Sequence, residues 1–189
     1  MPSDRETAFA VWLTGLPASG KSTVARALAA ELAGKGIRAA VLESDAVRRE
    51  ITPNASYGEA ERDAFYATLA YLARMLVLHG VPVIVDATAN RRTYRDRARA
   101  AIPRFLEAHV RCPLAVCQAR DSKGIYRRGA EGTAQNVPGV SAPYEPPLMP
   151  EVVVDGERDD PAVAARNIVS ALEKKGFLPR GSGDATETG

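Results

Sequence analysis

One short segment of the chain carries the residue types and spacing of a phosphate-binding loop. Residues 15–22 read Gly-Leu-Pro-Ala-Ser-Gly-Lys-Ser and fit the pattern G-x-x-x-x-G-K-S. Glycines allow backbone N–H groups to come close to a polyphosphate, the lysine pairs with the β- and γ-phosphates, and the serine hydroxyl binds Mg²⁺. An apolar run precedes the motif and a helix-forming segment follows it, as this loop requires. The sequence therefore predicts a nucleoside triphosphate site.

The residues of this predicted site have defined roles. Lys21 is the expected catalytic cation, and Ser22 is an expected ligand of Mg²⁺, the cofactor. The residues assigned to binding of the nucleotide are Gly15, Leu16, Pro17, Ala18, Ser19, Gly20, Lys21, Ser22 and Thr23.

Acidic residues follow two further predicted strands. Glu43 and Asp45 come at the end of one apolar run, and Asp86 ends another. Ligands of open α/β sheets bind beyond the carboxyl ends of the strands. Phosphoryl transfer uses one carboxylate near Mg²⁺ and one near the accepting hydroxyl. We assign Asp45 to the accepting hydroxyl, as a catalytic residue, and we assign Asp86 to the metal. The alternative for each is a solvated strand-end acid or a helix cap.

Two groups of arginines allow more than one interpretation. Arg48 and Arg49, one turn after Asp45, suit either an anionic acceptor or a solvent-facing helix start. Residues 91–99 contain five arginines and one acid, which fits contact with nucleic acid or a solvated helix face. Aromatic residues do not alternate with these arginines in the way that stacks bases. The solvated helix face is therefore favoured, and nucleic acid is not the expected partner.

Strands and helices alternate along the chain, which predicts a parallel sheet covered on both faces. We expect an α/β fold of the P-loop NTPase type, with a parallel five-stranded sheet in the order 2-3-1-4-5 and a mobile lid. Residues 39–42 are expected to form a short buried strand. The expected strands are residues 8–14, 39–42, 81–86, 105–110 and 152–154, and the expected helices are residues 21–34, 59–79, 92–101, 114–120 and 161–175.

A single kinase domain is expected over residues 1–178. Within it, residues 120–147 hold several glycines, four prolines and scattered charge without a helical or strand period. A loop this long in a compact domain is usually functional or disordered, and its basic residues favour a lid over phosphates. Residues 179–189 are expected to form a disordered tail, because they combine Gly, Ser, Thr and acids without periodicity.

The composition narrows the classes of partner and location. The chain has 189 residues and a formal net charge of +2, so charge alone indicates neither nucleic acid nor a membrane surface. No apolar run approaches the length of a membrane span, and residues 1–8 hold no signal-peptide core. Cys112 and Cys117 are expected to be buried free thiols. We therefore expect a cytoplasmic protein without membrane contact.

Further motifs resemble those of the adenylylsulfate kinases (APS kinases) over about residues 9–155. Residues 12–16, Trp-Leu-Thr-Gly-Leu, match the family's W-L-T-G-L, and residues 42–48, Leu-Glu-Ser-Asp-Ala-Val-Arg, are similar to its L-D-G-D-N-V-R. Residues 117–126, Cys-Gln-Ala-Arg-Asp-Ser-Lys-Gly-Ile-Tyr, resemble C-E-x-R-D-x-K-G-L-Y. Residues 143–147, Pro-Tyr-Glu-Pro-Pro, resemble P-Y-E-x-P.

The resemblance implies an ATP-dependent phosphotransferase with an alcohol group as acceptor. Its reaction would convert adenosine 5′-phosphosulfate to 3′-phosphoadenosine 5′-phosphosulfate in sulfate assimilation. The resemblance also implies a homodimer and places Arg120 at the adenine side of ATP and Lys123 near the anionic end of the second nucleotide. The residues assigned to the acceptor are Arg48, Tyr57, Arg62, Lys123, Asn136 and Val137.

The acceptor side departs from the family pattern. The family holds the adenine between a Phe before its middle helix and a Phe in the lid motif N-F-T-G, where this chain has Tyr57 and Val137. The family's polar E-N-I-R-R becomes Ala-Phe-Tyr-Ala-Thr at residues 64–68, and its I-S-P becomes Thr-Ala-Asn at residues 88–90. A tyrosine stacks on a base, but a valine has no π-face. A kinase of the same frame that acts on a different nucleotide-type or sugar-type hydroxyl is therefore the alternative.

Two other hypotheses have less support. An ATP-binding partner with little turnover is disfavoured, because the lysine, serine and acid expected for catalysis are all present. Residues 85–90 resemble the D-x-T-N segment of polynucleotide-kinase-like enzymes. Together with the arginines of residues 91–99, this likeness keeps phosphorylation of nucleic-acid ends open.

Overall fold

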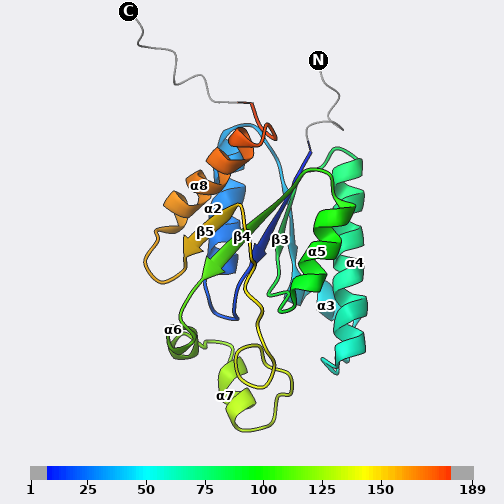
Figure 1. Cartoon of the computed structure of the whole chain (residues 1–189), viewed down its shortest axis with the longest axis vertical. Helices are drawn as coiled ribbons and strands as arrows, with labels where there is room; N and C mark the ends of the chain where they lie inside the picture. Colours follow the sequence, from blue (N-terminus) through cyan, green and yellow to red (C-terminus); the bar gives the residue numbers. More distant parts are fainter. Residues whose placement is uncertain (1–7, 180–189) are drawn as a thin grey trace, which may run out of the picture.

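A parallel sheet of five strands forms the centre of the computed structural model, which describes residues 8–179 (Figure 1). The strands lie in the order β2-β3-β1-β4-β5, and every neighbouring pair is parallel. The predicted fold class and strand order are confirmed. The strands are β1 (Ala10–Thr14), β2 (Ala40–Glu43), β3 (Val83–Asp86), β4 (Phe105–Arg111) and β5 (Val152–Asp155).

Helices cover both faces of the sheet, as the alternation of elements predicts. Figure 1 shows α2 and α8 on one face and α4 and α5 on the other. Within residues 8–179, no helix has the length and apolar character needed to cross a membrane. The helices are α2 (Lys21–Gly34), α3 (Ser44–Ile51), α4 (Glu59–Leu78), α5 (Arg92–Ala101), α6 (Leu114–Ala119), α7 (Ile125–Ala130) and α8 (Pro161–Lys174).

The central strand β1 is buried from end to end because it contributes to both hydrophobic cores. Val11 and Leu13 pack with α2 and α8, whereas Ala10 and Trp12 pack with α4 and α5. Successive side chains of a strand point to opposite faces, so a strand with helices on both sides is a continuous apolar run. The buried strand fixes the start of the phosphate loop that follows it.

The edge strand β2 differs from the prediction of a buried strand over residues 39–42. Ala40 and Leu42 pack against the core on the side of α4 and α5. Val41, on the opposite face, is 38% exposed. The prediction of a strand is therefore confirmed. The prediction that this strand is buried is wrong for the face that carries Val41.

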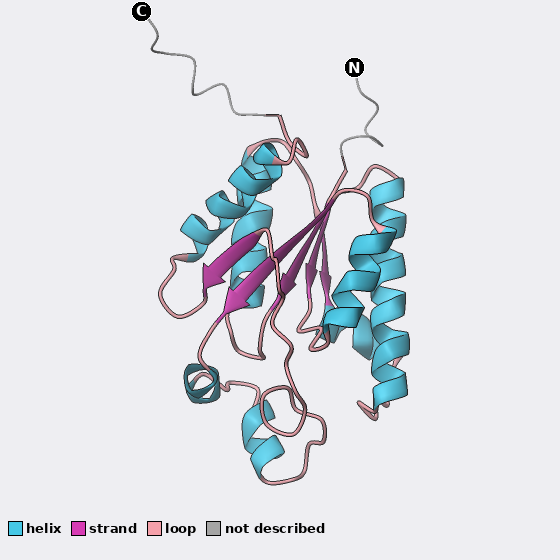
Figure 2. Ribbon diagram, viewed as in Figure 1, coloured by secondary structure: helices cyan, strands magenta, loops and turns pink. Residues whose placement is uncertain are grey.

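The predicted lid segment, residues 120–147, lies beyond the carboxyl ends of the strands (Figure 2). It contains α7, a short helix that the lack of periodicity did not predict. Tyr126 and Val137 pack with Cys112 and Cys117 into a small separate core, and both cysteines are free, as predicted. Mobility of the lid and the domain bounds remain predictions. The predicted tail lies, from residue 180 onwards, outside the described residues.

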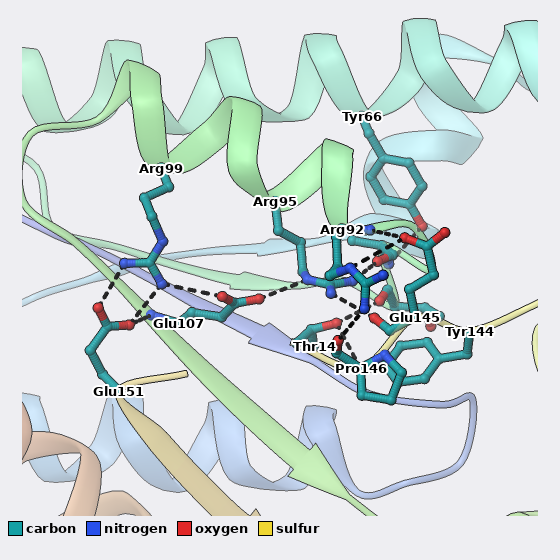
Figure 3. A network of polar contacts seen from close by, with 12 residues as sticks. Thr14, Tyr66, Arg92, Arg95, Arg99, Glu107, Tyr144, Glu145, Pro146 and Glu151 are labelled. Atoms are coloured by element: carbon teal, nitrogen blue, oxygen red, sulfur yellow. Dashed lines mark hydrogen bonds and ion pairs between the residues drawn. The ribbon is translucent and has the colours of Figure 1, made fainter. Parts of the chain in front are cut away.

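All five arginines of residues 91–99 form ion pairs within the chain, and Figure 3 shows Arg92, Arg95 and Arg99 among their partners. Arg95 is only 1% exposed, and its Nε donates to Glu107 on β4 at 2.7 Å. Arg99 pairs with Glu107 at 3.2 Å and with Glu151 at 2.7 Å. The interpretation of this run as a solvated helix face is wrong for Arg95, because a charge pattern along the sequence does not reveal distant partners. Arg95 and Arg99 therefore neutralise the carboxylates of Glu107 and Glu151.

We predict that Glu151 makes the stability of the fold sensitive to acid. Burial opposes its ionisation, but hydrogen bonds from Arg99, the Glu107 backbone N–H and Lys175 prevail and lower the pKa of Glu151 to about 2. A carboxyl whose pKa is lowered by folding stabilises the native state above its unfolded pKa, and this stabilisation is lost as the pH falls through the folded pKa. Glu151→Gln should therefore reduce the change in free energy of unfolding between pH 4.5 and pH 2, measured by urea unfolding.

The matched control for this prediction is Glu157→Gln, which alters an exposed acid in the turn after β5. Its pH dependence should equal that of the unaltered chain. A Glu151→Gln variant with an unaltered pH dependence would contradict the assignment.

Candidate active site

The phosphate loop joins β1 to α2 in a conformation that requires its glycines. A Cβ atom at Gly15 would lie 2.4 Å from the carbonyl oxygen of Val110 on β4, so the loop leaves no room for a side chain there. Gly20 has a φ of 103°, in a region that residues with a Cβ rarely adopt. α2 begins at the next residue, Lys21, and the first N–H groups of a helix have no partner within it. The loop and the helix start together form a cradle for phosphate oxygens.

Lys21 lies across the loop with its ammonium group buried. Its side chain is directed at the loop itself: Nζ donates to the carbonyl oxygens of Gly15 at 3.0 Å and Leu16 at 2.8 Å. Burial lowers the pKa of Lys21, and the charges of Asp86 and Asp45 oppose this shift. The negative charge of a bound polyphosphate would stabilise the cation in the same way.

Ser22 and Asp86, the pair predicted to hold Mg²⁺, are in direct contact. Ser22 Oγ donates to Asp86 Oδ2 at 2.5 Å, which joins the start of α2 to the end of β3. Among residues 8–179, no group of three or more His, Cys, Asp and Glu side chains could hold a metal ion. Mg²⁺ usually takes one or two protein ligands and completes its shell with phosphate oxygens and water. The pair therefore suits Mg²⁺ that is bound together with a nucleotide.

Asp45, the predicted catalytic acid, lies in the first turn of α3, directly after β2. Its side chain is 61% exposed, and Oδ2 accepts from Nζ of Lys123 at 2.7 Å. This hydrogen bond raises the pKa of Lys123. Because Lys123 belongs to the lid segment, the ion pair spans the space between the sheet and the lid.

Arg48 points inward, whereas Arg49 is exposed. Nη1 of Arg48 donates to Glu61 at 2.8 Å. Its guanidinium carbon lies 3.7 Å from the ring centre of Phe65 and 4.9 Å from that of Tyr57, distances at which a cation is attracted to an aromatic face. The interpretation as a solvent-facing helix start therefore holds for Arg49 and is wrong for Arg48.

Three further residues predicted for the acceptor meet where the lid approaches α4. Nδ2 of Asn136 donates to the carbonyl oxygen of Tyr57 at 3.0 Å. A guanidinium nitrogen of Arg62 donates to the carbonyl oxygen of Asn136. Tyr57 is 45% exposed and borders the cavity described below. Tyr57 thus offers an aromatic ring to a planar ligand at this part of the site.

Val137 follows Asn136 but does not present its side chain as a second stacking surface. It is buried in the lid core. A Cβ atom at Gly129 of α7 would lie 2.9 Å from Val137 Cγ2, so the two residues are in close contact. Val137 still borders the cavity, but of the two positions that the family fills with Phe, only that of Tyr57 carries a ring here.

Arg120 links the lid to the turn after β5. Its Nη1 donates to the carbonyl oxygen of Gly156 at 2.6 Å. This turn packs directly on the phosphate loop, since a Cβ atom at Gly156 would lie 2.2 Å from the carbonyl oxygen of Ser19. Arg120 therefore lies beside the phosphate loop, and its contact with the adenine of ATP remains a prediction.

One cavity of about 1100 Å³ brings nearly all the predicted residues together. Small-molecule pockets usually measure about 300–1000 Å³, so this cavity is large enough to suit two nucleotides. Of the residues assigned from the sequence, all but Gly15, Leu16 and Ser19 line it.

We call the side of the cavity formed by Arg48, Tyr57 and Arg62 the acceptor wall. The sequence-based prediction missed two residues that belong to this wall or support it. Phe65 lines the cavity but was not among the residues assigned to the acceptor. Glu61, which holds Arg48, carried no signal of its own, because an acid in the first turn of a helix is common. The replacement of a polar family motif at residues 64–68 was the one available sign that Phe65 belongs to the site.

The comparisons with known proteins show one family over most of the chain. The sequence profile of the family Adenylylsulphate kinase matches residues 7–155. The adenylyl-sulfate kinase of Gloeothece citriformis is 35% identical over 174 residues, which are 92% of this chain and 99% of that protein. A probable bifunctional SAT/APS kinase 2 from Sorangium cellulosum is 35% identical over 172 residues, and these cover 91% of this chain and 30% of that longer protein.

A solved structure of an APS kinase also resembles this chain. The Mycobacterium tuberculosis APS kinase CysC, solved in complex with AMPPNP and APS, superposes with a TM-score of 0.83 and 31% sequence identity. The match covers 88% of this chain and 98% of that one.

We predict that Asp86→Asn weakens the use of Mg²⁺. Loss of one carboxylate charge beside Ser22 should raise the Mg²⁺ concentration needed for half-maximal nucleotide binding roughly tenfold, within the range typical for residues that support a metal site. Titration of Mg²⁺ against a fluorescent ATP analogue measures this effect. Asp63→Asn, an exposed acid on α4, is the control and should bind as the unaltered chain does. An unchanged Mg²⁺ requirement in Asp86→Asn would exclude Asp86 from the metal site.

Proposed function

The chain belongs to the adenylylsulphate kinase family, and we propose that it transfers the γ-phosphate of ATP to the 3′-hydroxyl of adenosine 5′-phosphosulfate. As a member of this family it is a nucleotide-dependent kinase, a phosphotransferase with an alcohol group as acceptor. The proposed product is 3′-phosphoadenosine 5′-phosphosulfate. The proposal is carried by one observation: the phosphate loop, the carboxylate of Asp45 and a cationic, aromatic wall border the same large cavity.

The phosphate loop and Lys21 act on the nucleotide. Backbone N–H groups of the loop bind the phosphates, and Lys21 leaves the carbonyls of its own loop to pair with the phosphate oxygens. Ser22, with Asp86 in support, would hold Mg²⁺, which would supply positive charge to the phosphates when bound. Charge that develops on the transferred group is thereby stabilised by cations already in position.

Asp45 acts on the acceptor hydroxyl. Lys123 contacts only Oδ2 of Asp45 in the part of the chain that the structure describes, which leaves Oδ1 to accept a hydrogen bond from the hydroxyl. That hydrogen bond directs the oxygen at the γ-phosphorus and takes up its proton as transfer proceeds. Lys123 meanwhile neutralises part of the negative charge that collects where acid, hydroxyl and phosphate meet.

The acceptor wall recognises the second nucleotide through charge and stacking. Arg48 is fixed by Glu61 and two aromatic rings at the border of the cavity, where its cation attracts an anionic group such as the phosphosulfate. Tyr57 stacks on the adenine. One base–aromatic contact contributes about 1–3 kcal/mol, and we infer that Tyr57 provides it without a second ring from Val137. The lid then covers both nucleotides and excludes water, which favours transfer over hydrolysis.

The alternative is that the kinase acts on a different acceptor. The burial of Val137 and the ring of Phe65 in the cavity wall favour it. These two apolar residues reduce the number of polar contacts available to a sulfonucleotide. They suit a different nucleotide-type or sugar-type hydroxyl on the same kinase frame.

The deciding experiment measures ADP release by the purified protein with ATP and Mg²⁺, with and without adenosine 5′-phosphosulfate. Stimulation at micromolar acceptor, with formation of 3′-phosphoadenosine 5′-phosphosulfate, supports the proposal. Nucleotide binding without stimulation rejects it and directs the search to other nucleotides and to sugars.

From the same family membership we propose a cytoplasmic homodimer that acts in sulfate assimilation. Light scattering coupled to size-exclusion chromatography would test the dimer, because a monomeric mass at micromolar protein contradicts it.

We predict that Asp45→Asn separates binding from chemistry. The amide retains the shape of the side chain but cannot take up the hydroxyl proton, so kcat should fall by about 10²–10⁴-fold. ATP binding should stay within twofold, because the phosphate loop is unaltered. Steady-state kinetics and ATP titration measure the two effects, and turnover equal to that of the unaltered chain would remove Asp45 from the mechanism.

We predict that Arg48→Ala raises the KM for the acceptor and leaves the KM for ATP unchanged. Loss of a charge-assisted contact costs about 1.5–3 kcal/mol, which corresponds to roughly a ten- to hundredfold rise. Arg49→Ala, at the neighbouring exposed position, is the matched control and should change neither constant. If Arg48→Ala instead affects ATP alone, its assignment to the acceptor is wrong.

A further inference from the structure

Asn90, in the turn between β3 and α5, connects the acceptor wall to the lid. It is a buried polar residue, 4% exposed, and was not among the predicted site residues. Its Oδ1 accepts from Nη1 of Arg62 at 3.3 Å. Its Nδ2 donates to the carbonyl oxygen of Pro143 at 2.9 Å. The side-chain amide thus uses both of its ends, one toward the acceptor wall and one toward the lid.

The backbone of Asn90 adds a third connection at the same place. Its carbonyl oxygen accepts from the N–H of Glu145 at 2.8 Å. We call residues 143–145 the lid root, because the lid segment rejoins the body of the protein there. The lid root is further held by Tyr144, whose hydroxyl lies 3.1 Å from Oγ1 of Thr14 at the end of β1 (Figure 3).

The guanidinium group of Arg62 depends on hydrogen-bond acceptors that are fixed in place. Burial lowers the pKa of Arg62, which means that its charge is poorly solvated and needs protein oxygens around it. Within residues 8–179 those oxygens come from Asn90 and from the Asn136 carbonyl. Asn136 in turn holds the carbonyl of Tyr57. Arg62 therefore joins the middle of the lid segment, the stacking residue and Asn90 in one chain of hydrogen bonds.

The segment that carries Asn90 is itself held rigidly. Ala89 has a φ of 41°, in the left-handed region that residues with a Cβ rarely occupy, and surrounding contacts keep it there. Its N–H donates to the hydroxyl of Tyr66 at 3.0 Å, and its carbonyl oxygen accepts from buried Arg95. Figure 3 shows Tyr66 and Arg95 approaching this segment from α4 and α5. Such a support gives Asn90 little freedom to follow its partners.

We propose that Asn90 is a positioning residue that holds Arg62 at the acceptor wall and ties it to the lid root. Acceptor affinity and lid closure are then coupled through one side-chain amide. This inference rests on the proposed function, because it assigns Arg62 to the acceptor. It differs from a purely structural role in its prediction that the acceptor, and not ATP, responds to changes at Asn90.

The test uses Asn90→Ala and Asn90→Asp in the full chain, with Asn167→Ala on the exposed side of α8 as the matched control. Asn90→Ala removes both side-chain bonds and should raise the KM for adenosine 5′-phosphosulfate roughly five- to thirtyfold, as expected for a buried partner left unpaired. The KM for ATP should change less than twofold. Asn90→Asp keeps an oxygen for Arg62 and should recover most of the acceptor KM.

Trypsin provides a second readout that needs no acceptor. Asn90→Asp cannot donate to Pro143, so both variants should be cut faster in the lid, where Lys123, Arg127 and Arg128 are exposed. The control should be cut as the unaltered chain is. An unchanged acceptor KM in Asn90→Ala overturns the proposal, as do equal rises in both KM values together with a lower Tm.

Failure of the proposed function is visible separately. If the unaltered chain shows no turnover stimulated by adenosine 5′-phosphosulfate, that function is rejected, and trypsin cleavage alone decides the tie between Asn90 and the lid. Faster cleavage in Asn90→Ala with an unchanged Tm supports the tie, whereas an equal rate overturns it.

Discussion

A buried cation sets the requirements of the whole site. Lys21 has little contact with water, and burial of an unpaired charge is strongly unfavourable, so its ammonium group needs oxygen atoms close by. Carbonyls of its own loop provide two of them, and the carboxylates at the ends of β2 and β3 add negative charge. A parallel sheet makes this arrangement possible, because its strands all end at the same edge.

A second buried cation supports the site from behind. Arg95 directs its donors to the carboxylate of Glu107 and to the carbonyl oxygens of Ala89 and Glu145. Two of these three acceptors belong to the backbone of segments that border the cavity or hold its lid. The lid root is thus attached to the sheet through Arg95, because this buried cation needs the carbonyl oxygen of Glu145 as well as the carboxylate of Glu107.

The parts predicted from the sequence are those that depend on neighbouring residues or on sheet topology. The phosphate loop is a local motif, and the Ser22–Asp86 pair follows from where strands of a parallel sheet end. The burial of Arg95 was not predictable, because Glu107 on β4 holds it from another element. The inward direction of Arg48 depends on Glu61 and Phe65, and the position of Val137 depends on α7. Each of these was missed because tertiary contacts, and not local pattern, determine it.

The contact between Gly129 and Val137 has a consequence for how the acceptor pocket can change. The side chain of Val137 packs directly against Gly129 of α7, since even a Cβ atom at position 129 would come within 2.9 Å of the valine. A larger side chain at position 137 therefore has to leave this contact for the cavity or displace α7. The packing of the lid and the lining of the acceptor pocket thus depend on the same residue, Val137.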